Sequence, residues 1–266
     1  MANNRIEDLR DYEKQWPGLP VNYLILSCDD FIVFLDNEND LDWKTTDEFD
    51  GRNLSESEKK DYNDVMNEIA SIESIPCHDL EERIIQNFKR QVGEALVRNL
   101  QKDSINAKRM LSIAKQYIID RNSEKSRYLY LISSGCTAIF FVIVGFILWI
   151  SKEFWYNILG ETIFYILLSS IAGSIGALLS IILRIGNTNL DYHASKKLHY
   201  LEASSKIIAG MIGALLIALC IKCEIILPIF SKIDYTNLAM IVGGLIAGAS
   251  ERLVPSIIGK LDNTNE

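Results

Sequence analysis

The chain has few cysteines, and their arrangement excludes a disulfide framework. The five cysteines are odd in number and scattered along 266 residues, which favours reduced thiols in a cytosol or a bilayer. Cys220 and Cys223 form a lone C-x-x-C. A zinc or redox site would need a second pair or a histidine nearby, and we expect His193 and His199 on the opposite side of a membrane. We therefore treat the C-x-x-C spacing as coincidental. The other cysteines are Cys28, Cys77 and Cys136.

Other familiar signals are missing as well. The start of the chain has no basic region followed by an apolar stretch, so we expect internal segments, and no cleaved signal peptide, to direct insertion. The chain contains no P-loop, no nucleotide-binding glycine turn after a strand, no nucleophile elbow and no metal-protease helix. These absences predict that the protein is not an enzyme and uses no cofactor.

Basic residues are scarce in the first part of the chain. Residues 1–100 carry 23 acidic and 11 basic residues, a net charge of −12, whereas the remainder carries 12 acidic and 16 basic residues, a net charge of +4. Phosphate binding requires a basic surface, so the acidic part argues against nucleic acid as a partner. The division predicts an acidic soluble part followed by a membrane part.

The acidic stretch "DNENDLDWKTTD" resembles a calcium loop in outline. Asp36, Glu38, Asp40 and Asp47 fall at its positions 1, 3, 5 and 12. However, Leu41 occupies the sixth position, where the sharp turn of such a loop needs glycine. The pattern therefore favours a solvated acidic loop, and no metal site is predicted.

Uncharged apolar runs dominate the second part. Arg127 and Lys152 enclose 24 uncharged residues, and Glu161 and Arg184 enclose 22, each enough for a membrane-spanning helix of about 20 residues. Two shorter runs of 15 and 16 residues follow, and each becomes long enough if the charged residues at its ends extend to the lipid headgroups. The alternative for residues 207–250 is a re-entrant hairpin in place of two full spans.

Charges near the ends of these runs predict their orientation. Nine lysines and arginines collect on one side of the expected spans and three on the other, which places both termini in the cytoplasm. Because a charge near lipid is costly unless it is paired, we expect Glu251 to pair with Arg184 and Glu202 to face Arg252 or Lys206. In the alternative, Arg252 extends to the headgroups and Glu251 points to water.

Small residues recur at four-residue spacing in the second, third and fourth expected spans. This spacing lets helix backbones approach closely, within one chain or between copies, whereas the bulkier first span is expected to face lipid. The residues expected to pack helices together are Gly173, Gly176, Ala177, Gly210, Gly213, Ala214, Gly243, Gly244, Ala247 and Gly248.

The soluble part is expected to be mainly helical. "VNYLILS" and "FIVFLDN" are typical of two strands, and Ser55 with Glu58 has the spacing of a helix-capping box. An apolar stripe from Ile84 to Leu100, continued from Met110 to Ile118, predicts a helical neck that breaks near Asp103 and packs within the chain or against another copy.

The predicted fold is a mainly α, four-helix transmembrane bundle with a long cytoplasmic helical neck and a small N-terminal α+β cap. Its parts are the cap (1–78), the neck (79–126) and the membrane domain (127–258), with spans at about 129–151, 162–184, 204–226 and 236–256.

Two segments carry a resemblance to a known group. "GSIGALLSIILR" and "LIAGASERLVPSII" look like segments of uncharacterised bacterial multi-span membrane proteins, which have a glycine-rich span ending in Arg and a later "AG-x-SER-x-VP" segment. The resemblance covers roughly residues 160–258, with Ala249 where a bulky aromatic residue is expected. It implies a multi-pass protein of the bacterial inner (cytoplasmic) membrane and no established activity. A neck joined to short-looped spans is also similar in outline to small membrane effectors of bacterial defence systems.

Two classes of function are consistent with these features. In the first, which is the function we predict from the sequence, the protein is an oligomeric bacterial inner-membrane effector or channel whose cytoplasmic part senses a protein or small-molecule signal and which acts on the membrane. In the second, it is a non-conducting membrane anchor or scaffold for a cytoplasmic partner. The expected partners are the lipid bilayer and further copies of the chain. A pore requires a wet interior, and the only polar lining that the sequence offers is Ser169, Ser170, Ser174 and Ser180.

Overall fold

The computed structural model describes residues 12–77, 80–187, 195–223 and 236–250, and these are mainly helical. The chain divides into two compact units, Met1–Glu124 and Lys125–Glu266. Residues Glu251 and Arg252 of the predicted charge cluster lie outside the described residues.

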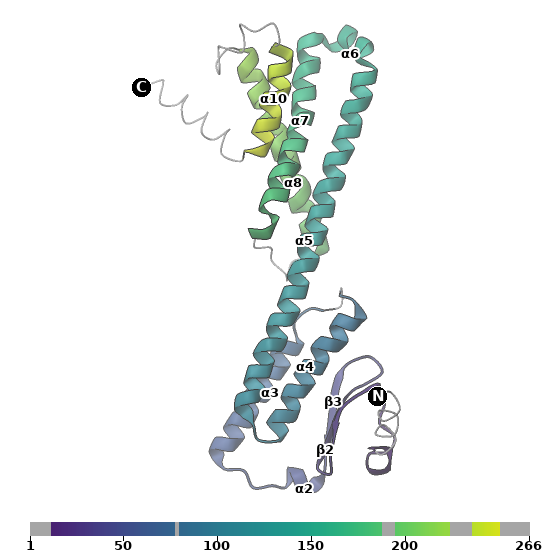
Figure 1. The fold of residues 1–266 in the computed structure, drawn as a ribbon, viewed down its shortest axis with the longest axis vertical. Coiled ribbons are helices and arrows are strands. Elements are labelled where there is room, and N and C mark those ends of the chain that lie inside the picture. The colour runs from purple at the N-terminus through teal and green to yellow at the C-terminus, as the bar shows by residue number, and fades with distance from the viewer. Residues whose placement is uncertain (1–11, 78–79, 188–194, 224–235, 251–266) are drawn as a thin grey trace, which may run out of the picture. The chain divides into compact units, whose positions relative to one another are not determined.

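A three-stranded antiparallel sheet forms part of the N-terminal unit (Figure 1). The predicted pair of strands is confirmed as β1 (Tyr23–Ser27) and β2 (Phe31–Leu35). The third strand, β3 (Leu41–Thr45), pairs with β2 along its whole length, so the expectation of a loop over this stretch was wrong. Only Leu41 of β3 is buried, because β3 lies at the sheet edge. The strand therefore lacks the alternation of apolar residues that reveals a half-buried strand.

The central strand β2 is buried on both of its faces. Val33 and Leu35 join the core formed with the helices, whereas Ile32 and Phe34 pack against Trp16 in the segment that precedes the sheet. Full burial of five consecutive apolar residues explains why β2 reads as a continuous apolar run.

Helices complete this unit (Figure 1). A short helix, α2 (Asp47–Asp50), precedes α3 (Glu56–Glu73), whose N-terminus has the predicted capping box of Ser55 and Glu58. Helix α4 (Glu82–Leu100) then ends where predicted. Lys102 adopts a left-handed φ of 67°, which turns the chain into α5 (Ser104–Ile150).

The predicted apolar stripe is buried inside one chain. Phe88, Val92 and Leu96 of α4 share a core with Leu111 and Ile118 of α5, with α3 and with the sheet. The stripe therefore needs no second copy to cover it, and of the two alternatives the structure shows packing within the chain. Asn99 strengthens this packing, because its amide donates a hydrogen bond to the carbonyl of Tyr62 in α3 (3.3 Å).

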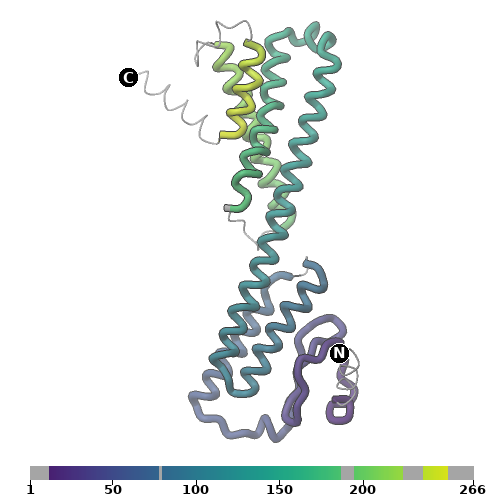
Figure 2. Tube along the Cα trace, viewed as in Figure 1, coloured from purple at the N-terminus to yellow at the C-terminus, as the bar shows by residue number. Residues whose placement is uncertain are grey.

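The C-terminal unit contains the apolar helices, whose path can be followed in Figure 2. Three helices are long and apolar enough to cross a membrane: α5, α7 (Glu161–Arg184) and α8 (Lys196–Lys222). The fourth, α10 (Thr236–Ala249), has 14 described residues, so the predicted four-span bundle is confirmed only as far as these three long helices. Between α5 and α7 lies a short helix, α6 (Lys152–Leu159), and a 3-10 turn, η1 (Ile185–Asn187), follows α7.

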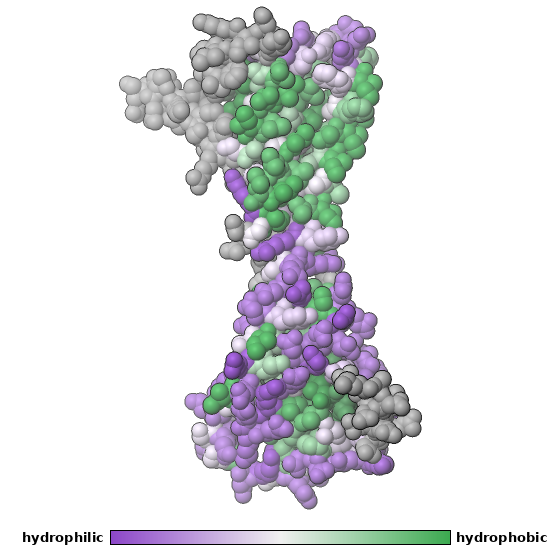
Figure 3. Space-filling model, in the orientation of Figure 1, coloured by the Kyte–Doolittle hydropathy of each residue, from purple (hydrophilic) through white to green (hydrophobic). Residues whose placement is uncertain are grey.

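Helices α7, α8 and α10 pack on one another, and α5 lies against α7 and α8 through Tyr130 and Ala138. The outer face of α5 exposes large apolar side chains, including Phe140 (61%) and Phe146 (64%). Hydrophobic residues cover most of the visible face of this unit in Figure 3. In water such a surface would drive aggregation, so its extent is typical of a protein that lies in lipid.

Candidate functional site

Small residues bring α7 and α8 into close contact. Gly173 has no room for a side chain, because a Cβ there would meet the Cβ of Ala214 and lie 2.8 Å from the carbonyl oxygen of Gly210. In the same way, a Cβ at Gly210 would lie 2.6 Å from the Cβ of Ala177. Two glycine–alanine steps, one on each helix, thus interlock with each other.

Helix α10 approaches α7 with equal closeness. A Cβ at Gly176 would meet the backbone of Leu245 and Ala249, and one at Gly244 would meet Ser169. Gly248 lies against the backbone of Gly173. Of the remaining small residues, Gly243 faces the side chains of Ile217 and Ile221, whereas Gly213 and Ala247 are buried. The small faces therefore bring α7, α8 and α10 of one chain together.

Hydroxyl groups link the same helices. The hydroxyl of Ser169 in α7 donates to the carbonyl of Met240 in α10 (2.6 Å), and that of Ser170 donates to the carbonyl of Met211 in α8 (3.0 Å). Ser174 donates within its own helix to Ile171 (2.7 Å). The sequence offers these three serines as polar lining for a pore. In the structure all three are buried: the hydroxyls of Ser169 and Ser170 bond to neighbouring helices, and that of Ser174 bonds to its own helix.

The predicted charge cluster is described only in part. Arg184 is the exposed last residue of α7, and Glu202 is exposed on α8 one turn before Lys206. Two of their expected partners, Glu251 and Arg252, lie outside the described residues, and Lys206, the alternative partner of Glu202, forms no ion pair with it in the described part of the chain. The pairing of Arg184 with Glu251 and of Glu202 with Arg252 therefore stays a prediction.

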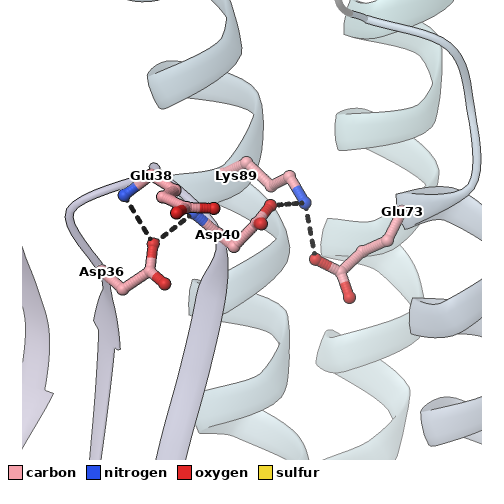
Figure 4. Close-up of polar contacts among 5 residues, drawn as sticks. All are labelled: Asp36, Glu38, Asp40, Glu73 and Lys89. Carbon is pink, nitrogen blue, oxygen red and sulfur yellow. Dashed lines mark hydrogen bonds and ion pairs between the residues drawn. The ribbon is translucent and has the colours of Figure 1, made fainter.

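An unpredicted ion cluster lies in the N-terminal unit, where Lys89 of α4 joins two carboxylates (Figure 4). The Lys89 ammonium lies 3.0 Å from a carboxylate oxygen of Glu73, at the end of α3, and 3.2 Å from one of Asp40, in the turn between β2 and β3. The lysine side chain is only 10% exposed. Burial alone would lower the pKa of Lys89, but hydrogen bonds and charge from Glu73 and Asp40 outweigh it and raise the pKa above its usual value of 10.5.

This cluster explains what the acidic stretch after β2 does. Asp36 accepts hydrogen bonds from the backbone N–H groups of Glu38 and Asp40, both at 2.9 Å, and so closes the turn (Figure 4). Asp40 then reaches Lys89. The carboxylate of Asp36 thus stabilises the turn, and the carboxylate of Asp40 forms an ion pair with Lys89. Within the described part of the chain, no three acidic, histidine or cysteine side chains are grouped to hold a metal ion.

A small hollow of about 200 Å³ opens where α3 begins and α4 ends. The guanidinium of Arg52 stacks on the ring of Phe49, and the ammonium of Lys102 lies 3.1 Å from the Glu58 carboxylate. Burial, followed by the charge of Asp50, raises the pKa of the Tyr62 phenol in the wall. The charges around this hollow are thus held by one ion pair, between Lys102 and Glu58, and one cation–π contact, between Arg52 and Phe49.

Comparison of the chain with protein-family models, curated proteins and solved structures found no match. The resemblance to bacterial multi-span proteins therefore stays a prediction.

Proposed function

We propose that the chain is a multi-pass membrane anchor that holds its acidic N-terminal unit at the inner membrane of a bacterium, where this unit binds a cytoplasmic partner. Three helices long and apolar enough to cross a membrane support the location. We further propose that α10 completes a fourth span together with residues after Ala249, and that both termini are cytoplasmic, as the distribution of lysine and arginine predicts.

The observation that carries this proposal is the close packing of α7, α8 and α10. A conducting pathway needs polar groups or backbone carbonyls that face water. Here the hydroxyls of Ser169 and Ser170 bond to neighbouring helices, and glycines bring the backbones into direct contact. This arrangement favours a rigid anchor over a pore through a single chain.

The N-terminal unit has the properties of a binding module. Its core is completed within one chain, so its surface is available to a partner. The net charge of −12 over residues 1–100 favours a partner with a basic surface, because complementary charge speeds encounter and aligns the partners.

An oligomeric effector is the second candidate. The observation that favours it is the apolar face of α5, where Ile139, Phe140, Phe146 and Ile147 are all more than half exposed. Lipid would cover this face in an anchor. Neighbouring copies would cover it in an effector and could then build a pore between them.

Membrane potential distinguishes the two candidates. Bacteria expressing the full chain from a tightly controlled promoter would be monitored with a voltage-sensitive dye, with and without phage challenge, beside bacteria expressing a chain that ends at Glu124. An anchor leaves the potential intact under every condition, while the full chain is recovered in the membrane fraction. Depolarisation that requires residues 125–266 would overturn the anchor and establish the effector. Recovery of the full chain in the soluble fraction would overturn both.

A further inference from the structure

A cleft of about 380 Å³ lies between α7, α8 and α10. Small apolar residues form most of its walls, among them Ala177, Ala209 and Ala247, and the polar residues that line it are Ser180, Lys206 and Ser250. Its volume falls within the range of about 300–1,000 Å³ that is typical of ligand pockets. It therefore has room for part of a ligand, with an apolar body and few polar groups.

Ser180 in the wall of this cleft differs from the other buried serines of α7. Ser169, Ser170 and Ser174 each donate a hydrogen bond to a backbone carbonyl. The residue Ser180 is also buried, with 7% of its surface exposed, yet its hydroxyl has no hydrogen-bond partner among the described residues. Buried hydroxyls are normally satisfied, so this one points to a group that the described residues do not supply.

Lys206 supplies a positive charge at the edge of the cleft. It is exposed, its ammonium lies 5.7 Å from the centre of the Tyr130 ring, and no carboxylate of the described chain forms an ion pair with it. Lys206 and Ala209 also line a second hollow of about 370 Å³ along α8, together with Leu198, Leu201, Glu202 and Ser205. Lys206 therefore lines both of these largely apolar hollows. Glu202 lines only the second of them.

We propose that this cleft binds an anionic phospholipid. The phosphate would pair with Lys206, an acyl chain would lie along the apolar walls, and the Ser180 hydroxyl would donate to an oxygen of the lipid. Basic pockets between membrane helices on the cytoplasmic side are suited to anionic headgroups, and the distribution of positive charge predicts that Lys206 lies on that side. A zwitterionic lipid offers no net charge to Lys206 and binds less well.

Native mass spectrometry of the purified full chain in detergent tests this inference. The protein would be titrated with phosphatidylglycerol and, separately, with phosphatidylcholine of the same acyl chains. We expect about fivefold tighter binding of phosphatidylglycerol, the contribution of one basic residue near a membrane surface. Lys206→Gln should abolish this preference. Lys222→Gln, at the other end of the same helix and outside the cleft, should retain it.

Ala209→Leu provides a second variant, because it fills the cleft from an exposed position and leaves the charge of Lys206 intact. It should weaken binding of both lipids.

Equal binding of the two lipids by the unaltered chain would overturn the proposal, as would equal effects of Lys206→Gln and Lys222→Gln. The latter result would mean that Lys206 only extends to bulk headgroups. The inference rests on the proposed membrane location and not on the choice between anchor and effector. Loss of lipid preference in a chain that still inserts into membranes would overturn the lipid site alone.

Discussion

Gly248 of α10 lies directly against the backbone of Gly173 in α7, so that a Cβ added to Gly248 would stand 2.8 Å from both the Cα and the carbonyl carbon of Gly173. Backbone atoms cannot rotate out of the way as the end of a side chain can. The separation of the two helices is therefore set by the absence of side chains at these two positions.

Gly248→Ala should consequently destabilise the C-terminal unit. Pushing two packed helices apart costs about 1–3 kcal/mol, and the effect would appear as a lower melting temperature in detergent. Gly135→Ala in α5 is the matched control, because a Cβ there meets nothing within 4 Å. That control should be neutral or stabilising by up to about 1 kcal/mol, since alanine favours helix over glycine. Equal melting of the two variants would mean that α7 and α10 do not meet at Gly248.

Ser169→Ala should also lower stability, by a smaller amount. It removes the 2.6 Å hydrogen bond from α7 to the carbonyl of Met240 in α10. Hydrogen bonds between membrane helices contribute about 0.6 kcal/mol on average and at most about 1.7 kcal/mol. Ser204→Ala is the control, because Ser204 bonds only to carbonyls of its own helix, those of Tyr200 and Leu201. Thermal melting of both variants should show a loss for Ser169→Ala alone. A loss of the same size in the control would assign the effect to the helix and not to the contact.

Local signals account for what the sequence predicted well. The extent of α7 follows from one uncharged run between Glu161 and Arg184, and the start of α3 follows from the spacing of Ser55 and Glu58. Each of these features is encoded by neighbouring residues, so no knowledge of the tertiary fold is needed to find it.

Contacts between distant residues explain the features that could not be predicted from the sequence. Asp40, Glu73 and Lys89 are brought together only when α3, α4 and the sheet pack, so the spacing of these charges in the sequence carries no signal. The roles of Ser169 and Ser170 were equally hidden, because a serine in an apolar helix can line a pore or bond to a neighbouring helix. Only the position of that neighbour decides between the two.

Lys89→Met tests the ion cluster while it preserves the length of the buried stem. It leaves the half-buried carboxylate of Glu73 without its partner, and we expect a loss of about 1–3 kcal/mol in chemical denaturation followed by circular dichroism. Adding Glu73→Met should recover part of this loss, because an apolar pair can replace a buried ion pair at little cost. Lys59→Met, which removes an exposed pair with Glu56, should change stability by less than about 0.5 kcal/mol.

The same cluster predicts a dependence on alkaline pH. Because the folded protein raises the pKa of Lys89 above 10.5, its stabilisation is fully present below pH 10.5 and is lost as the pH rises through the folded-state pKa. The stability difference between the unaltered chain and Lys89→Met should therefore shrink above pH 10.5. A difference that stays constant to higher pH would show that the lysine stem, and not its charge, is what matters.

Glu58 predicts a dependence on acidic pH. Hydrogen bonds from the backbone N–H and the hydroxyl of Ser55, and then the hydrogen bond and charge of Lys102, lower the pKa of Glu58 from 4.5 to about 2. A lowered pKa stabilises the fold above pH 4.5, and this contribution is lost as the pH falls from 4.5 towards 2. Glu58→Gln, which retains a hydrogen-bonding side chain without the charge, should melt at a lower temperature than the unaltered chain at pH 7.

The difference in melting temperature between Glu58→Gln and the unaltered chain should vanish as the pH approaches 2, because protonation then removes the charge of Glu58 from the unaltered chain as well. Glu56→Gln is the matched control, since Glu56 lies in the same first turn of α3 and takes no part in the capping box. Melting curves from pH 7 to pH 2, followed by helical circular dichroism, should show a larger effect of Glu58→Gln at pH 7. If the two variants behaved alike at every pH, a general preference of helix N-termini for negative charge would suffice, and the bond between Ser55 and Glu58 would have no special part.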